Sequence, residues 1–139
     1  MSEQAHEHEP PNLRTVRAYL AAIEAGAGAE QLAAFFTPDA QQREFPNRLV
    51  PAGAERGLAD LLAGRERGRQ VVEDERYEVH DALVDGDRVA VELTWTARLR
   101  VPLGAARPGD LMRARCGVFF TLAGGRIARQ HNYDCFSAF

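Results

Sequence analysis

The residues best suited to chemistry stand in the last stretch of the chain, residues 125–136, which follows a tight glycine-containing turn. His131 and Asp134 lie here, and both side chains can exchange protons with a bound molecule. The stretch is too polar for an ordinary buried strand, yet Ile127 and Phe136 argue against exposed coil. We predict the closing strand of a curved antiparallel sheet whose concave side forms a pocket.

The pairing of this strand with its predecessor decides which side chains act together. If the turn is centred between residues 123 and 124, Arg115 lies opposite Asn132 and Arg113 opposite Asp134, all on one face. The other face then carries Met112, Cys116, Phe120, Ile127, His131, Tyr133 and Cys135. A cross-strand ion pair of Arg113 with Asp134 is the structural alternative to a catalytic role. One β-bulge would exchange the two faces, so the face that lines the pocket stays open.

Several kinds of site are excluded by the spacing of residues. The histidines and cysteines lack metal-ligand spacing, and there is no glycine-rich phosphate loop and no nucleophile elbow. We therefore expect neither a metal nor a cofactor. Cys116 and Cys135 are not directly opposite in the predicted hairpin, which favours free thiols in a reducing compartment.

Length and charge narrow the class of protein. The 139 residues suit one domain with a real core, and we expect it to span residues 12–139 after a disordered, acidic leader at 1–11. The net charge of −3 argues against nucleic acid as a partner. No apolar run approaches the roughly 20 residues that cross a bilayer, and the leader is no secretory signal. We expect a cytoplasmic protein without a membrane partner.

The first half of the chain predicts helices. Asn12 is a plausible N-cap for a helix that ends near Gly26 or Gly28. Its apolar side chains recur at helical spacing: Leu13, Val16, Tyr19, Leu20 and Ile23. A short second helix carries Phe35 and Phe36 and ends before Pro38, residues 39–45 are extended, and a third helix spans residues 54–68.

From residue 71 onward the hydrophobic period changes to two. Tyr77, Val79 and Leu83 alternate with polar residues, and the turn at residues 85–87 is a strong hairpin signal. The next strand points one set of side chains inward: Val89, Val91, Leu93, Trp95, Ala97 and Leu99. A strand at residues 111–122 precedes the closing strand. Helices first and four long antiparallel strands afterwards indicate an α+β fold.

This order of elements resembles the nuclear transport factor 2-like superfamily, and within it the SnoaL-like branch, over about residues 12–136. The motifs that carry the resemblance are the first helix Ala-Tyr-Leu-Ala-Ala-Ile-Glu-Ala-Gly, Phe-Thr-Pro-Asp-Ala at 36–40, Gly-Asp-Arg-Val-Ala-Val-Glu-Leu-Thr-Trp-Thr at 86–96 and Gly-Arg-Ile at 125–127. The resemblance implies a cone of three N-terminal helices packed on a curved antiparallel sheet, a hydrophobic cavity and a homodimer through the outer sheet face. Members include ketosteroid isomerase, polyketide cyclases, limonene epoxide hydrolase, dehydratases and binding domains without chemistry, so the fold alone does not assign a function.

Set against ketosteroid isomerase, Tyr19 matches the tyrosine that donates to the enolate oxygen, and Glu44 matches the carboxylate base. Such a carboxylate needs an apolar cavity that raises its pKa, and that isomerase is itself a standard example. The structural alternatives are a core tyrosine and a rim carboxylate paired with Arg43 or Arg48. The third acid of the isomerase falls near Gly117, where this chain has none, so steroid isomerisation is not expected.

Two further comparisons concern the strands. The epoxide hydrolase carries an Arg and an Asp two residues apart on one strand, where this chain has Leu93 and Trp95. Its catalytic aspartate matches Asn132. Because an amide cannot take a proton from water, we do not expect epoxide hydrolysis. Trp95 then lines the cavity wall or fills the core. In SnoaL-like cyclases an acid near the end of the last strand transfers the proton, which makes Asp134 a candidate, with His131 either as its partner or as a structural histidine.

The resulting hypothesis is a small-molecule-binding protein with an apolar pocket for a hydrophobic carbonyl compound. If it is an enzyme, we expect an isomerase, cyclase or dehydratase that acts by proton transfer. The candidate catalytic residues are Glu44, Tyr19 and Asp134, and the candidate ligand-binding residues are Trp95, Leu93, Arg115, Asn132, His131 and Phe120. The alternative is a non-catalytic domain that binds a ligand or a protein partner.

Overall fold

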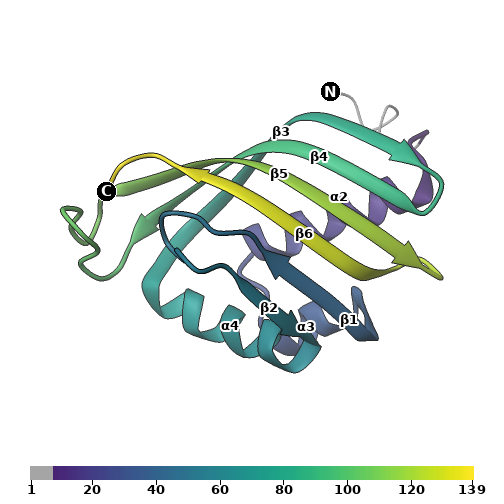
Figure 1. The fold of residues 1–139 in the computed structure, drawn as a ribbon, viewed down its shortest axis with the longest axis horizontal. Helices are drawn as coiled ribbons and strands as arrows, with labels where there is room; N and C mark the ends of the chain where they lie inside the picture. The colour runs from purple at the N-terminus through teal and green to yellow at the C-terminus, as the bar shows by residue number, and fades with distance from the viewer. Residues whose placement is uncertain (1–7) are drawn as a thin grey trace.

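A computed structural model describes residues 8–139; residues 1–7 of the predicted leader lie outside the described part. The elements are α2 (Pro11–Glu24), α3 (Ala29–Ala33), β1 (Phe36–Glu44), β2 (Ala54–Gly57), α4 (Leu58–Val71), β3 (Val72–Asp85), β4 (Arg88–Leu99), β5 (Leu111–Ala123) and β6 (Arg126–Phe136). The strands form one curved sheet in the order β2-β1-β6-β5-β4-β3, and α2 and α4 lie on one side of it (Figure 1). The α+β architecture and the four long antiparallel strands are as predicted.

Helix α2 supplies the roof over the sheet. Its apolar stripe is buried as predicted, and Val16 and Tyr19 are 0% and 5% exposed. The helix begins at Pro11 after Pro10, because proline suits the first helical position. The predicted N-cap at Asn12 is wrong: this residue lies inside the helix, and its amide donates to the Gly86 carbonyl at 3.1 Å.

Two short predicted helical stretches are strands. Phe36 begins β1, where it is 2% exposed and pairs with Ile127 of β6. Residues 54–57 were predicted as the start of the third helix, but they form β2 antiparallel to β1, and the helix begins only at Leu58. The β1–β6 pair is parallel, so the sheet is not antiparallel throughout.

Strand β3 pairs with β4 through the predicted hairpin turn, but it contains a shift in register between Val79 and Asp81. Since side chains alternate between faces with a period of two, this shift turns Leu83 away from the core that Tyr77 and Val79 contact. The prediction that these three share a face is wrong for Leu83, which is 68% exposed.

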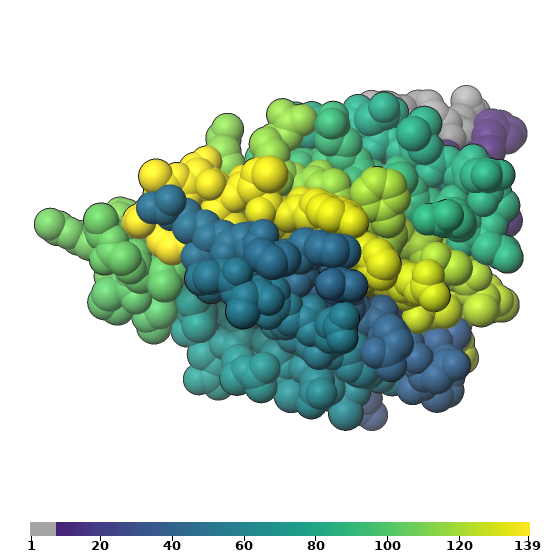
Figure 2. Space-filling model, viewed as in Figure 1, coloured from purple at the N-terminus to yellow at the C-terminus, as the bar shows by residue number. Residues whose placement is uncertain are grey.

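The core lies between α2 and the inner face of the sheet, and Phe36, Leu93, Phe120 and Ile127 are among its most buried side chains. The segment between β4 and β5 projects from one end of the molecule, close to the C-terminal residues (Figure 2). Within residues 8–139, no helix has the length and hydropathy needed to cross a membrane.

Candidate functional site

The face presented by β6 is decided by one extra residue. The β5–β6 turn places Gly124 and Gly125 at positive φ, 58° and 78°, as a two-residue hairpin turn requires. The turn is centred one residue later than predicted, and this change alone would leave each side chain of β6 on the face that was predicted for it. The register then shifts where Leu122 pairs with Ile127 and Thr121 pairs with residue 129, leaving Ala128 as a bulge. Every later side chain of β6 therefore points to the opposite face from the one predicted.

Because of this bulge, Asp134 lies opposite Cys116. The predicted cross-strand pairs of Arg113 with Asp134 and of Arg115 with Asn132 are wrong. Between the bulge and the end of the strand, the inner face carries Gln130, Asn132, Asp134 and Phe136, and the outer face carries Arg129, His131, Tyr133 and Cys135. The acidic side chain thus faces α2, while His131 does not.

A cavity of about 200 Å³ lies between α2 and the inner face of the sheet. Its lining is Tyr19, Leu20, Ile23, Leu49, Tyr77, Leu93, Trp95, Ala114, Cys116, Val118, Phe120, Gln130, Asn132, Asp134 and Phe136. Most of these side chains are apolar or aromatic, as is usual for sites that bind small organic molecules. Six predicted site residues meet here: Tyr19, Leu93, Trp95, Phe120, Asn132 and Asp134.

The polar groups of the cavity follow β6 at every second residue. The Gln130 amide donates to Asn132 Oδ1 at 2.9 Å, and Asp134 is the next residue on the same face. Among the described residues, two buried acceptors have no hydrogen-bond partner: Gln130 Oε1 and Asp134 Oδ1. An unsatisfied buried acceptor is costly, so each of these atoms is a candidate acceptor for a hydrogen bond from a bound molecule.

Asp134 is the acid whose surroundings favour proton exchange. Burial raises the pKa of its carboxyl above the ordinary value, and the nearby charge of Glu44 acts in the same direction. Hydrogen bonding from the Cys116 thiol and the Asn132 side chain opposes this rise in pKa. Burial likewise raises the pKa of the Cys116 thiol, which makes it a neutral neighbour rather than a nucleophile.

Tyr19 presents its phenol to the same cavity. Its ring packs edge-on against Phe36 and Phe120, with centroids 5.3 and 6.3 Å away. Burial raises the pKa of the hydroxyl to about 12, although the charge of Arg65 and a hydrogen bond with Gln130 act to lower it. The phenol therefore keeps its proton at neutral pH and can donate it in a hydrogen bond.

The wall around Trp95 contains a charged group that the sequence analysis missed. Trp95 Nε1 donates to Glu75 Oε2 at 3.1 Å, and the other carboxylate oxygen of Glu75 pairs with Arg65. Both charged side chains are nearly buried, at 11% and 13% exposure for Arg65 and Glu75. Glu75 shares the inner face with Tyr77, two residues later on β3, and a register shift between Glu73 and residue 76 bends the strand beside it, where Asp74 has a φ of 53°. Asp tolerates positive φ better than most residues, which is the one sequence signal for this bend.

Glu44 does not line the cavity. Its carboxylate pairs with Arg56 at 3.0 Å and accepts from Asn47 Nδ2 at 3.1 Å, so neither predicted partner, Arg43 or Arg48, binds it. Arg43 instead pairs with Glu55 at 3.6 Å.

The Glu44 contacts anchor the loop between β1 and β2. Asn47 Oδ1 accepts from the backbone N–H groups of Leu49 and Val50, both at 2.9 Å. Leu49 lines the cavity and is 41% exposed, so the cavity opens beside it. In Figure 2 this loop (blue) lies against the C-terminal residues (yellow), where Arg48 donates to the Phe139 carbonyl at 3.4 Å. Glu44 thereby positions the mouth of the cavity.

Replacing Glu44 by glutamine should lower the free energy of unfolding by about 1–2 kcal/mol, because the hydrogen bonds of a charged, largely buried group are weakened. Urea unfolding of the purified variant measures this change. Glu55→Gln is the matched control: its pair with Arg43 is exposed, and the change should stay within about 0.5 kcal/mol. Equal stability losses in the two variants would contradict the anchoring role.

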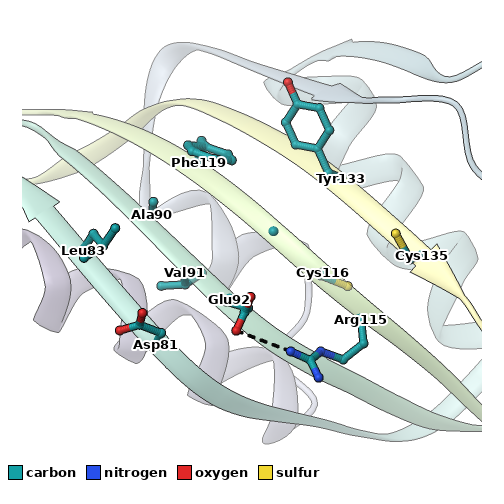
Figure 3. Close-up of a pocket in the computed structure, with 11 residues that line it drawn as sticks. Asp81, Leu83, Ala90, Val91, Glu92, Arg115, Cys116, Phe119, Tyr133 and Cys135 are labelled. Carbon is teal, nitrogen blue, oxygen red and sulfur yellow. Dashed lines mark ion pairs between the residues drawn. The ribbon is translucent and has the colours of Figure 1, made fainter.

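The remaining predicted site residues, Arg115 and His131, lie on the outer face. A hollow of about 510 Å³ is open there, and Figure 3 shows Leu83, Phe119 and Tyr133 around it, with Arg115 paired to Glu92 at 3.4 Å. Burial and the charges of neighbouring arginines lower the pKa of His131, which keeps its ring neutral at pH 7. These two residues cannot share a ligand with Asp134, because the sheet separates them.

The solved structures similar to this chain include two Streptomyces proteins and one protein of Catenulispora acidiphila. IdmH of Streptomyces antibioticus, a candidate polyketide cyclase, aligns with a TM-score of 0.74 and 20% identity over 88% of this chain and 91% of its own. AclR of Streptomyces galilaeus, a candidate hydroxylase, aligns with a TM-score of 0.73 and 18% identity over 88% of this chain and 74% of its own. A protein of Catenulispora acidiphila with a ketosteroid isomerase-like fold was solved in complex with trimethylamine. It aligns with a TM-score of 0.68 and 19% identity over 86% of this chain and 83% of its own.

Identities this low establish a common fold and no more. They show the nuclear transport factor 2-like fold, with helices packed on a curved, largely antiparallel sheet, that the order of elements predicted. No curated protein matches the sequence significantly. The SnoaL-like domain family matches residues 16–130, which is most of the chain. The chain belongs to the SnoaL-like domain family.

Proposed function

We propose that the protein binds a small hydrophobic carbonyl compound in the inner cavity and catalyses proton transfer with Asp134 as the base. The observation that carries this proposal is the Asp134 carboxyl group: it lines an apolar cavity, its pKa is raised by burial, and its Oδ1 has no partner among the described residues. Such a carboxylate has more basicity than one in water.

The proposed step balances without a cofactor. Asp134 takes a proton from a carbon next to the substrate carbonyl, and the C–H electron pair forms the enolate. Tyr19 donates a hydrogen bond to the oxygen that gains charge, which its protonated hydroxyl allows. The Asp134 carboxylic acid then returns the proton to the same carbon, which gives exchange, or to another carbon, which gives isomerisation. In an aldol-type ring closure the enolate carbon instead bonds to the carbon of a second carbonyl group of the substrate, and the Asp134 acid gives its proton to the alkoxide oxygen that results. The candidate cyclase IdmH shares the fold.

The size of the cavity limits the substrate. At about 200 Å³ it is smaller than the range of roughly 300–1,000 Å³ that is usual for drug-sized ligands. One or two fused rings therefore fit the proposal better than the four rings of a steroid.

The test is hydrogen–deuterium exchange of 2-tetralone, a two-ring ketone with acidic C–H groups, followed by NMR in D₂O. The wild-type protein should accelerate exchange and Asp134→Asn should not. Glu92→Gln, on the outer face, is the control and should exchange at the wild-type rate. If all three proteins exchange alike, Asp134 is not the base. If 2-tetralone binds but does not exchange, the cavity is a binding site without this chemistry.

We also propose that the outer face forms a dimer with a second copy of the chain. Leu83, Phe119 and Tyr133 are 68%, 46% and 44% exposed around the outer hollow, and large apolar patches mark interaction surfaces. The hollow also carries Arg115 and Glu92, so the patch can pair with itself about a two-fold axis.

Phe119→Glu should convert this dimer to a monomer, halving the mass measured by light scattering at micromolar concentration, because a buried unpaired charge is costly. Val101→Glu, at another exposed apolar side chain outside the hollow, should leave the mass unchanged. A monomeric wild-type protein would contradict the proposal.

A further inference from the structure

The second unpartnered acceptor of the cavity, Gln130 Oε1, is not used by the proposed proton transfer. Gln130 is 5% exposed, and its side chain lines the cavity. Its Nε2 group is occupied, since it donates to Asn132 Oδ1 at 2.9 Å. The amide is thereby held with its oxygen free.

Gln130 Oε1 has no hydrogen-bond partner among the described residues. Its neighbour across β5 is the apolar Phe120, and its neighbour across β1 is Gln42, whose side-chain oxygen accepts from Arg56 at 3.3 Å. A buried carbonyl oxygen that lacks a partner is less stable than a satisfied one, because it has lost its bond to water without replacement. A ligand that supplies a donor at this point would recover that loss, and a ligand without one would not.

We propose that the cavity selects a hydroxylated ring ketone, whose hydroxyl group donates to Gln130 Oε1 while its carbonyl-bearing ring lies toward Asp134. This inference rests on the proposed function and names the substrate class of the same site. The two unpartnered acceptors have different roles: the neutral amide oxygen is too weak a base to take a proton from carbon, and the carboxylate is not.

A neutral hydroxyl fits these acceptors better than an ammonium group. An ammonium ion would pair with the Asp134 carboxylate and lower its basicity, because an opposite charge favours the ionised acid. A hydroxyl at Gln130 leaves Asp134 free. Gln130 is then a specificity-determining residue, which discriminates between a ligand with the donor and an isostere without it.

The test compares the affinities of 6-hydroxy-2-tetralone, 6-methoxy-2-tetralone and unsubstituted 2-tetralone by calorimetry. Wild-type protein should bind the hydroxy ketone at least about tenfold more tightly than the other two. Gln130→Met, which keeps the length of the side chain and removes the acceptor, should bind all three ketones with similar affinity. Gln42→Met is the matched control on the neighbouring strand, outside the cavity, and should keep the tenfold preference.

The outcomes separate this inference from the proposed function. Equal affinity of wild-type protein for the three ketones would overturn it, since a water molecule then satisfies Gln130 equally well. The same holds if Gln130→Met keeps the preference. Because the comparison within the wild type needs no variant, a poorly folded Gln130→Met cannot rescue the idea. Exchange of 2-tetralone without a hydroxyl preference would overturn this inference alone, and failure of every ketone to bind would overturn both proposals.

Discussion

Replacing Arg65 by methionine should lower the free energy of unfolding by about 3–5 kcal/mol, because removal of one partner leaves the Glu75 charge buried and uncompensated. The two side chains are only 11% and 13% exposed, and Glu75 also accepts from the Trp95 indole. Arg65 further donates to the carbonyls of Ile23 and Ala27 at the end of α2, both at 3.4 Å. The variant loses these helix-terminal contacts as well.

Urea unfolding at pH 7 measures this effect. The double variant Arg65→Met, Glu75→Gln should recover a large part of the loss, because it removes the unpaired charge and keeps an acceptor for the Trp95 indole. Arg69→Met is the matched control in the same helix: its pair with Glu66 is 42% and 50% exposed, and the change should stay within about 0.5 kcal/mol. An Arg65→Met protein as stable as this control would contradict the account of the network.

Replacing Asp134 by asparagine should slow the exchange of 2-tetralone by about 100-fold or more, the usual contribution of a positioned general base. The same variant should be more stable than the wild type at pH 7. Since burial raises the pKa of Asp134 in the folded protein, its ionisation costs free energy of folding. The amide avoids that cost.

The sign of the pH dependence follows from this raised pKa. The stabilising contribution of protonated Asp134 is fully present below the unfolded pKa of about 4 and is lost as the pH rises through the higher folded value. The advantage of Asp134→Asn should therefore be largest at pH 7 and shrink as the pH falls toward 4, in urea unfolding at both values. Asp81→Asn, which changes a carboxylate to an amide on the outer face, is the matched control variant. An Asp134→Asn protein that is less stable at pH 7 would show that the carboxylate is needed structurally.

Much of the architecture was predictable from the sequence because it depends on long, regular patterns. The apolar spacing from Leu13 to Ile23 predicted α2, and the alternation from Val89 to Leu99 predicted the buried face of β4. Short elements were less predictable. Residues 54–57 contain no strand pattern of their own, and they become β2 because β1 offers them hydrogen-bond partners.

The composition of the cavity was predictable only in part. Tyr19, Leu93 and Trp95 lie on regular elements, so their faces follow from counting residues. Glu44 has the right residue type, but the partners that hold it, Arg56 and Asn47, come from other segments and were not foreseen.

The amino-acid sequence by itself determined the long helix and the four long strands, since these follow from repeating patterns of burial, and its motifs carried the resemblance to the family. Only the tertiary structure decided which acid enters the cavity. A single bulged residue, Ala128, exchanges the faces of β6 and brings Asp134 inward. Because side chains on a strand alternate with a period of two, one extra residue reverses every later assignment. Its position depends on how the curved sheet closes against the helices, which no local pattern records.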